Sequence, residues 1–112
     1  MASTITGDMS KTLRQLMTEV IEAGEKFPNK WDLKTYYVDL VEEVGELGNA
    51  VLIETGSKSR KRQRSELKDS LADIFFVLIL MANEAGIDLE AVLRQMLLEL
   101  KVRQENKDYY FE

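Results

Sequence analysis

The chain has 112 residues, with 15 basic and 20 acidic side chains, which gives a formal net charge of -5 and fits a single domain. Histidine and cysteine are both absent. Their absence excludes disulfides, thiol nucleophiles, histidine acid–base chemistry and the usual zinc sites, so a metal would need oxygen ligands, as magnesium and manganese do. The acidic balance argues against binding to polymeric nucleic acid, and a chain without cysteine fits the cytoplasm.

Apolar residues make up 45% of the chain and proline occurs once, which favours long helices in a globular protein. The first ten residues lack the apolar stretch of a signal peptide. The most apolar run, residues 74–82, is far shorter than the roughly 20 residues that cross a bilayer, so no membrane partner is expected. We predict one all-α domain over residues 9–105, between a flexible N-terminal tail (1–8) and a C-terminal tail (106–112).

Apolar residues at helical spacing predict a first helix that ends at Phe27-Pro28, with Asp8 or Ser10 as its N-terminal cap. A loop that contains Trp31 follows this helix. The aromatic ring could stack on a ligand or simply pack the loop against the helices, and the sequence leaves both roles open.

A second helix is predicted after Asp32, a good cap, and should end at Gly56. Gly45 and Gly48 lie inside it, and each costs about 1 kcal/mol relative to alanine in an exposed helix. Close helix packing or the approach of a ligand would explain them, and so would a tolerated defect.

A third helix is predicted from Ser65 to Ala85, with Gly86 as its stop, and a fourth after the cap Asp88. The run 74–82 is apolar on every face of the third helix, which is typical of burial all round. A chain this short needs a neighbouring copy to provide such burial, so we expect a homodimer or homotetramer.

Acidic residues gather on the second and third helices at spacings of three and four. They are Glu42, Glu43 and Glu46 on the second helix and Glu66, Asp69 and Asp73 on the third. Such spacings place each set on one helix face, and two antiparallel helices could join the faces into a carboxylate cage for one or two divalent cations. A solvated face is the common alternative for the glutamates alone, but an aspartate directly before the apolar run favours a metal.

Two strings, WDLKTYYVDLVEEVGELGNAV and ELKDSLADIFFVLILMANEAGIDLEAVL, resemble the MazG-like, all-alpha nucleotide pyrophosphohydrolases, and the resemblance covers about residues 25 to 105. It implies a four-helix bundle-like protomer that assembles into a dimer or tetramer. It also implies magnesium-dependent hydrolysis of nucleoside triphosphates to the monophosphate and pyrophosphate, with manganese as a possible replacement for magnesium. The cellular role that the resemblance implies is housecleaning, the removal of unwanted nucleotides from the pool.

In that family an ExxE pair and an ExxD pair bind the metal. The ExxE pair carries over onto Glu43 and Glu46, and the aspartate of ExxD onto Asp73. Ser70 stands where the family has the glutamate of ExxD, and the adjacent Asp69 is the expected substitute.

The resemblance also suggests roles in catalysis and substrate binding. Because histidine is absent, Glu43 or Glu46 is expected to orient or deprotonate the attacking water. Trp31 matches a family tryptophan beside the nucleotide base. Basic candidates for phosphate contacts are Lys34, the segment from Lys58 to Arg64, Lys101 and Arg103, any of which could equally be a solvated surface charge.

Two other functions remain open from the sequence. Hydrolysis of phosphoribosyl-ATP uses a similar scaffold and chemistry. A non-catalytic helical oligomer that has lost a metal ligand is the second, and Ser70 is the residue that favours it.

Overall fold

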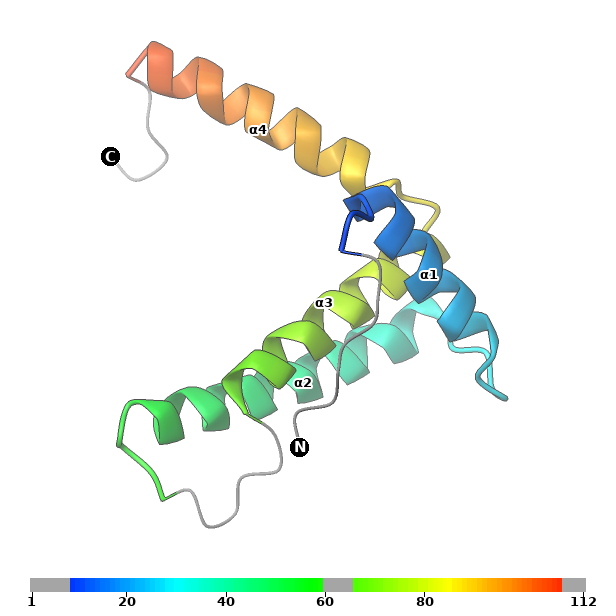
Figure 1. Cartoon of the computed structure of the whole chain (residues 1–112), viewed down its shortest axis with the longest axis vertical. Coiled ribbons are helices and arrows are strands. Elements are labelled where there is room, and N and C mark those ends of the chain that lie inside the picture. Colours follow the sequence, from blue (N-terminus) through cyan, green and yellow to red (C-terminus); the bar gives the residue numbers. More distant parts are fainter. Residues whose placement is uncertain (1–8, 60–65, 108–112) are drawn as a thin grey trace.

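The computed structural model describes residues 9–59 and 66–107 and arranges them as four helices without strands (Figure 1). These helices are α1 (Leu13–Glu25), α2 (Leu33–Glu54), α3 (Leu67–Glu84) and α4 (Leu89–Glu105). The predicted all-α, four-helix fold is confirmed. The predicted N-terminal tail, residues 60–64 of the basic segment and residues 108–112 of the C-terminal tail lie outside the described residues.

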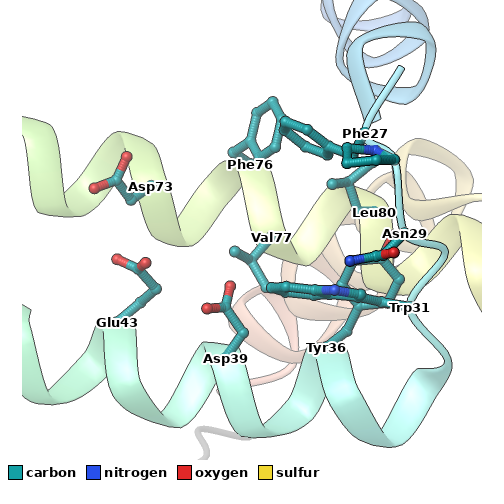
Figure 2. Close-up of a pocket in the computed structure, with 11 residues that line it drawn as sticks. Phe27, Asn29, Trp31, Tyr36, Asp39, Glu43, Asp73, Phe76, Val77 and Leu80 are labelled. Atoms are coloured by element: carbon teal, nitrogen blue, oxygen red, sulfur yellow. The ribbon is translucent and has the colours of Figure 1, made fainter. Parts of the chain in front are cut away.

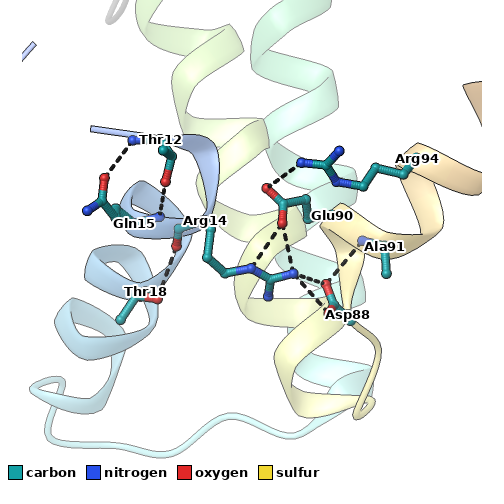
Figure 3. Close-up of polar contacts among 8 residues, drawn as sticks. All are labelled: Thr12, Arg14, Gln15, Thr18, Asp88, Glu90, Ala91 and Arg94. Carbon is teal, nitrogen blue, oxygen red and sulfur yellow. Dashed lines mark hydrogen bonds and ion pairs between the residues drawn. The ribbon is translucent and has the colours of Figure 1, made fainter. Parts of the chain in front are cut away.

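Helix α1 begins with a cap that differs from the predicted one. Thr12 is the N-cap: its hydroxyl accepts a hydrogen bond from the Gln15 backbone N–H at 3.2 Å, and the Gln15 side chain accepts one from the Thr12 N–H at 2.7 Å (Figure 3). This reciprocal pair is a capping box, which satisfies two backbone donors at once. The prediction of Ser10 as the cap was therefore wrong, and Asp8 lies outside the described residues.

The other helix boundaries follow local signals in the sequence. Asp32 and Asp88 cap α2 and α4 as predicted, and each carboxylate accepts a hydrogen bond from the backbone N–H three residues later, at 2.8 Å and 3.1 Å. Gly56 and Gly86 follow α2 and α3 with φ of 80° and 72°, a conformation that costs glycine least. Helix α3 begins at Leu67 rather than at the predicted Ser65.

An antiparallel pair, α2 and α3, forms the centre of the protomer, and α1 packs across α3 (Figure 1). The buried apolar side chains come mainly from α3: Val77, Ile79, Leu80 and Ala82, joined by Met17, Ala50 and Ile53. Full burial of each large side chain stabilises the fold by about 1.5–3 kcal/mol. Close approach of α1 to α3 occurs at Gly24, where an added Cβ would lie 2.6 Å from Leu80 Cδ2.

Helix α4 leaves this centre and extends away from α2 and α3 (Figure 1). None of its residues is buried, although it carries six large apolar side chains with exposed fractions of 41–60%. Its direction differs from that of α3 by 104°. In the part of the chain described, no single helix is long and apolar enough to cross a membrane, and only the bent α3–α4 pair meets that test jointly.

The apolar run of α3 is buried on one side only within the protomer. Phe75 and Leu78 are 47% and 38% exposed, so one protomer does not bury residues 74–82 all round, and the burial predicted with a neighbouring copy stays a prediction. The reason is geometric, because α1 and α2 cover only part of the circumference of α3 and α4 turns away.

Ionic contacts join the start of α4 to α1 (Figure 3). The Arg14 guanidinium donates to both oxygens of Asp88 at 2.8 and 2.9 Å and to Glu90 Oε1 at 3.0 Å. The pKa of Asp88 is lowered, first by the hydrogen bond from the Ala91 backbone and then by Arg14. Charged contacts thus join the first turn of α4 to α1, while no residue of α4 is buried.

We expect Thr12→Ala to destabilise the protein by about 1 kcal/mol, because the substitution removes an N-cap hydrogen bond. For a domain of this size the melting temperature should fall by about 4–8 °C. Thermal denaturation followed by circular dichroism measures the shift. Thr18→Ala is the matched control, since Thr18 lies inside α1 and its hydroxyl only donates to the Arg14 carbonyl oxygen. Equal melting temperatures for Thr12→Ala and the unsubstituted chain would contradict the capping role.

Candidate active site

Three carboxylates converge where α2 and α3 face each other. Glu43 and Glu46 lie one turn apart on α2. Asp73 lies on α3 across from Glu43 (Figure 2). One oxygen from each of the three lies within 4.8 Å of the others. The structure therefore brings together the ExxE pair and the aspartate that the sequence singled out.

Glu43 is the least exposed of the three carboxylates. Its Oε2 is buried and has no hydrogen-bond partner among the described residues. Burial raises the pKa of Glu43, and the negative charges of Glu46 and Asp73 raise it further. A buried oxygen without a donor, surrounded by like charges, is costly unless a cation compensates it. The donor set fits a hard divalent cation such as magnesium or manganese, which prefers oxygen ligands.

A cavity of about 420 Å³ opens beside these carboxylates (Figure 2). Its lining residues are Phe27, Pro28, Asn29, Trp31, Tyr36, Asp39, Glu43, Asp73, Phe76, Val77 and Leu80. The carboxylates occupy one end and aromatic rings the other, where the Trp31 and Tyr36 ring centroids are 5.6 Å apart at an interplanar angle of 57°. The cavity thus joins an acidic end to an aromatic end, a combination that suits a ligand with both a metal-binding group and a planar ring.

Asp39 is a cavity residue that the sequence analysis missed. It lies one turn before Glu43, and burial raises its pKa, followed by the charges of Glu42, Glu46 and Asp73. A sequence signal existed, because positions 39, 43 and 46 have the i, i+4, i+7 spacing of one helix face. Tyr36 was missed for a different reason, since its place at the aromatic end depends on the fold of the preceding loop.

Several predicted site residues do not reach the cavity within one protomer. Asp69 is exposed in the first turn of α3 and is not among the three carboxylates that share a position. Lys34 is exposed at the start of α2. Lys101 and Arg103 lie near the end of α4, which points away from the α2–α3 pair (Figure 1). No lysine or arginine lines the cavity in the part of the chain that the structure describes.

Ser70, at the position of the family's glutamate, is fully buried. It precedes Asp73 by one turn of α3. The described carboxylate group therefore consists of two glutamates and one aspartate rather than four acids.

Comparison with known proteins identifies the class to which this site belongs. The model of the MazG nucleotide pyrophosphohydrolase domain matches residues 32–107, and the chain belongs to this family. The predicted resemblance is thereby confirmed, and membership supports a nucleotide pyrophosphohydrolase activity.

A solved structure shares the fold. The crystal structure of the putative pyrophosphatase YPJD from Bacillus subtilis is similar with a TM-score of 0.68 and 26% sequence identity, over 83% of this chain and 96% of that one. A comparison with curated protein sequences gives no match.

The raised pKa of Glu43 gives a prediction about the metal-free protein. An acid whose pKa is raised by folding stabilises the fold below its ordinary value of 4.5, and this contribution is lost as the pH rises through the raised value. Glu43→Gln should therefore stabilise the metal-free protein at pH 7 by about 0.5 kcal/mol, the scale of a like-charge pair one helical turn apart. The melting temperature should rise by about 2–4 °C.

Thermal denaturation in the presence of a chelator, at neutral and at acidic pH, measures this effect. The difference between Glu43→Gln and the unsubstituted chain should vanish at acidic pH, where both side chains are neutral. Glu22→Gln, a substitution of an exposed glutamate on α1, should leave the melting temperature unchanged at both pH values. A lower melting temperature for Glu43→Gln at neutral pH would show that the carboxylate is not repelled in the metal-free fold.

Proposed function

We propose that the protein hydrolyses nucleoside triphosphates to the monophosphate and pyrophosphate with magnesium as its cofactor. The observation that carries the proposal is the convergence of Glu43, Glu46 and Asp73 at one end of a cavity whose other end is aromatic. The described lining of the cavity has no lysine or arginine. A triphosphate is an anion, so we expect it to bind there only when a cation accompanies it. Removal of unwanted nucleotides from the cellular pool is the role that fits such a reaction.

The role that we propose for each residue follows from its place along the cavity. Glu43, Glu46 and Asp73 would hold the magnesium ion. When bound, this ion neutralises phosphate charge and acts as a Lewis acid. Trp31 offers a flat face on which the base can stack. The base would thus lie at the aromatic end and the α-phosphate at the carboxylates.

Water is the nucleophile in this scheme and a carboxylate guides it. Glu43 Oε2, which is buried and has no hydrogen-bond partner among the described residues, would accept a hydrogen bond from the water and orient it toward the α-phosphorus, with Glu46 as the second candidate. A bond forms between the water oxygen and the α-phosphorus while a proton of the water passes to the carboxylate. The bond to the bridging oxygen of the β-phosphate breaks, and pyrophosphate leaves. Positive charge for the leaving group comes from outside the cavity lining, with Lys34, Lys101 and Arg103 as candidates.

Assembly into a homodimer or homotetramer is part of the proposal. Helix α4 has no buried residue and exposes Val92, Leu93, Met96, Leu97, Leu98 and Val102. A helix of 17 residues that packs so little is marginal by itself in water, because helix stability in proteins comes mainly from packing. A second copy that covers α4 and the exposed Phe75 side of α3 would supply that packing.

The activity test uses the purified protein, magnesium and a panel of ribo- and deoxyribonucleoside triphosphates, with products separated by anion exchange. Glu46→Ala and Asp73→Ala should each lower kcat/KM by at least about 100-fold, because changes around metal ligands already cost about 10- to 100-fold. Asp69→Ala is the matched control, and it should keep most of the activity because Asp69 lies outside the three converging carboxylates.

The outcomes separate the remaining possibilities. A loss in Asp69→Ala equal to that in Asp73→Ala would assign Asp69 the role of the missing ExxD glutamate. Turnover of phosphoribosyl-ATP alone would move the proposal to that substrate. No turnover of any nucleotide with magnesium or manganese would favour a non-catalytic oligomer, which the serine at position 70 would then explain.

If copies assemble through α4, one charge placed on its apolar face should shift the oligomeric state toward the monomer. The unsubstituted chain should sediment as a dimer or tetramer at micromolar concentration, and Leu97→Glu should shift it toward the monomer, because Leu97 is 55% exposed on the uncovered apolar face. Analytical ultracentrifugation measures both states. Gln104→Glu adds the same charge at an exposed polar position of α4 and should leave assembly intact. A compact monomer for the unsubstituted chain would contradict the proposed assembly.

A further inference from the structure

Asp39 occupies the middle of the cavity, and neither the metal nor the base accounts for it. Tyr36, Asp39 and Glu43 line the cavity from one face of α2 (Figure 2). With a rise of about 1.5 Å per residue, Asp39 lies about 4.5 Å along the helix from Tyr36 and about 6 Å from Glu43. The carboxylate therefore stands between the aromatic end and the metal-binding end.

Among the described residues, the Asp39 carboxylate has neither a hydrogen-bond donor nor a positive charge as a partner. In the part of the chain that the structure describes, no group donates a hydrogen bond to this carboxylate, and the charges that act on it, Glu42, Glu46 and Asp73, are all negative. Asp39 is also not one of the three carboxylates whose oxygens meet within 4.8 Å. A ligand that supplies a hydrogen-bond donor at this depth of the cavity would pair with this carboxylate.

The chemistry of a nucleotide restricts what that donor is. A phosphate group has only acceptor oxygens and like charge when ionised, so it does not pair with Asp39. A base stacked at Trp31 leaves the adjacent sugar between the aromatic end and the α-phosphate. The hydroxyls of that sugar are neutral donors at the depth of Asp39, and Val77 on α3 offers an apolar surface to the sugar ring from across the cavity (Figure 2).

We propose that Asp39 accepts a hydrogen bond from a hydroxyl of the nucleotide sugar and thereby selects substrates that carry one. This inference rests on the proposed function, because it assumes a nucleotide in the cavity. Asp39 positions the sugar and takes no part in the bond-breaking step. The contact also fixes the distance between the stacked base and the α-phosphate, so its loss should reduce productive binding rather than metal affinity.

The test compares three triphosphates of the same base: the ribonucleotide, the 2′-deoxyribonucleotide and the 2′,3′-dideoxyribonucleotide. In the unsubstituted protein, kcat/KM should be about 10- to 100-fold lower for the dideoxyribonucleotide than for the better of the other two, which is the loss expected for a hydrogen bond to a charged group. In Asp39→Ala this preference should disappear, while kcat/KM for the dideoxyribonucleotide changes by less than about twofold. A loss confined to the ribonucleotide would identify the 2′-hydroxyl, and equal losses for the ribonucleotide and the 2′-deoxyribonucleotide would identify the 3′-hydroxyl.

Two further variants keep the test sharp. Asp39→Asn retains a carbonyl acceptor, so it should keep part of the sugar preference. This variant replaces Asp39→Ala in the comparison if Asp39→Ala does not fold. Trp31→Ala should lower kcat/KM by a similar factor for all three substrates, because the base that it contacts is common to them. The magnesium concentration for half-maximal activity should be the same in Asp39→Ala and the unsubstituted protein.

Each contrary result has its own meaning. Equal losses on all three sugars in Asp39→Ala, or a raised magnesium requirement, would overturn the sugar contact and assign Asp39 to the metal-binding end. The comparison is repeated with a second base, and a loss in Asp39→Ala that depends on the base and not on the sugar would place Asp39 against the base and overturn the sugar contact. Failure of the unsubstituted protein to hydrolyse any nucleotide would contradict the proposed function itself, and the sugar contact with it.

Discussion

Repulsion between carboxylates that apolar packing holds together is the constraint on which this structure depends. Helices α2 and α3 pack against each other, with Ile53 and Val77 buried, and this packing brings an oxygen of Glu43, Glu46 and Asp73 within 4.8 Å of one another. In water these groups would separate, since like charges repel and each prefers full hydration. The burial of apolar surface offsets that cost and holds the three carboxylates together.

The same pair of helices explains why the cavity has two unlike ends. Antiparallel packing places the acidic turns of α2 opposite the start of the apolar run on α3, and it places the first turn of α2 near the loop with Trp31 (Figure 2). Residues one turn apart on α2 therefore meet three environments in succession: the Trp31 ring beside Tyr36, a carboxylate at Asp39 on which only negative charges act among the described residues, and the three converging carboxylates at Glu43. A nucleotide has the matching order of base, sugar and phosphate.

Helix α4 shows a different balance of forces. Its first turn is joined to α1 by Arg14, whereas its apolar side chains remain exposed and the helix extends away from the α2–α3 pair. The cavity therefore lies on one part of the protomer and the uncovered apolar surface of α4 on another. Assembly through that surface would stabilise α4 without occupying the cavity, because the cavity residues belong to α2, α3 and the loop before α2.

The sequence by itself determined the helices and the acidic positions. Asp32, Asp88, Gly56 and Gly86 mark boundaries through local hydrogen bonds and backbone conformation, which depend only on neighbouring residues. The spacing of Glu43 and Glu46 placed them on one face for the same local reason.

Only the tertiary structure decided which acids meet and what lies between them. It brought Asp73 to the two glutamates, left Asp69 outside their group, and turned Asp39 into the cavity with Tyr36 and Phe76. It also turned α4 away from the α2–α3 pair, so that the side of α3 carrying Phe75 stays uncovered in one copy. These outcomes depend on how helices pack across long separations in the chain, and helical periodicity carries no information about that packing.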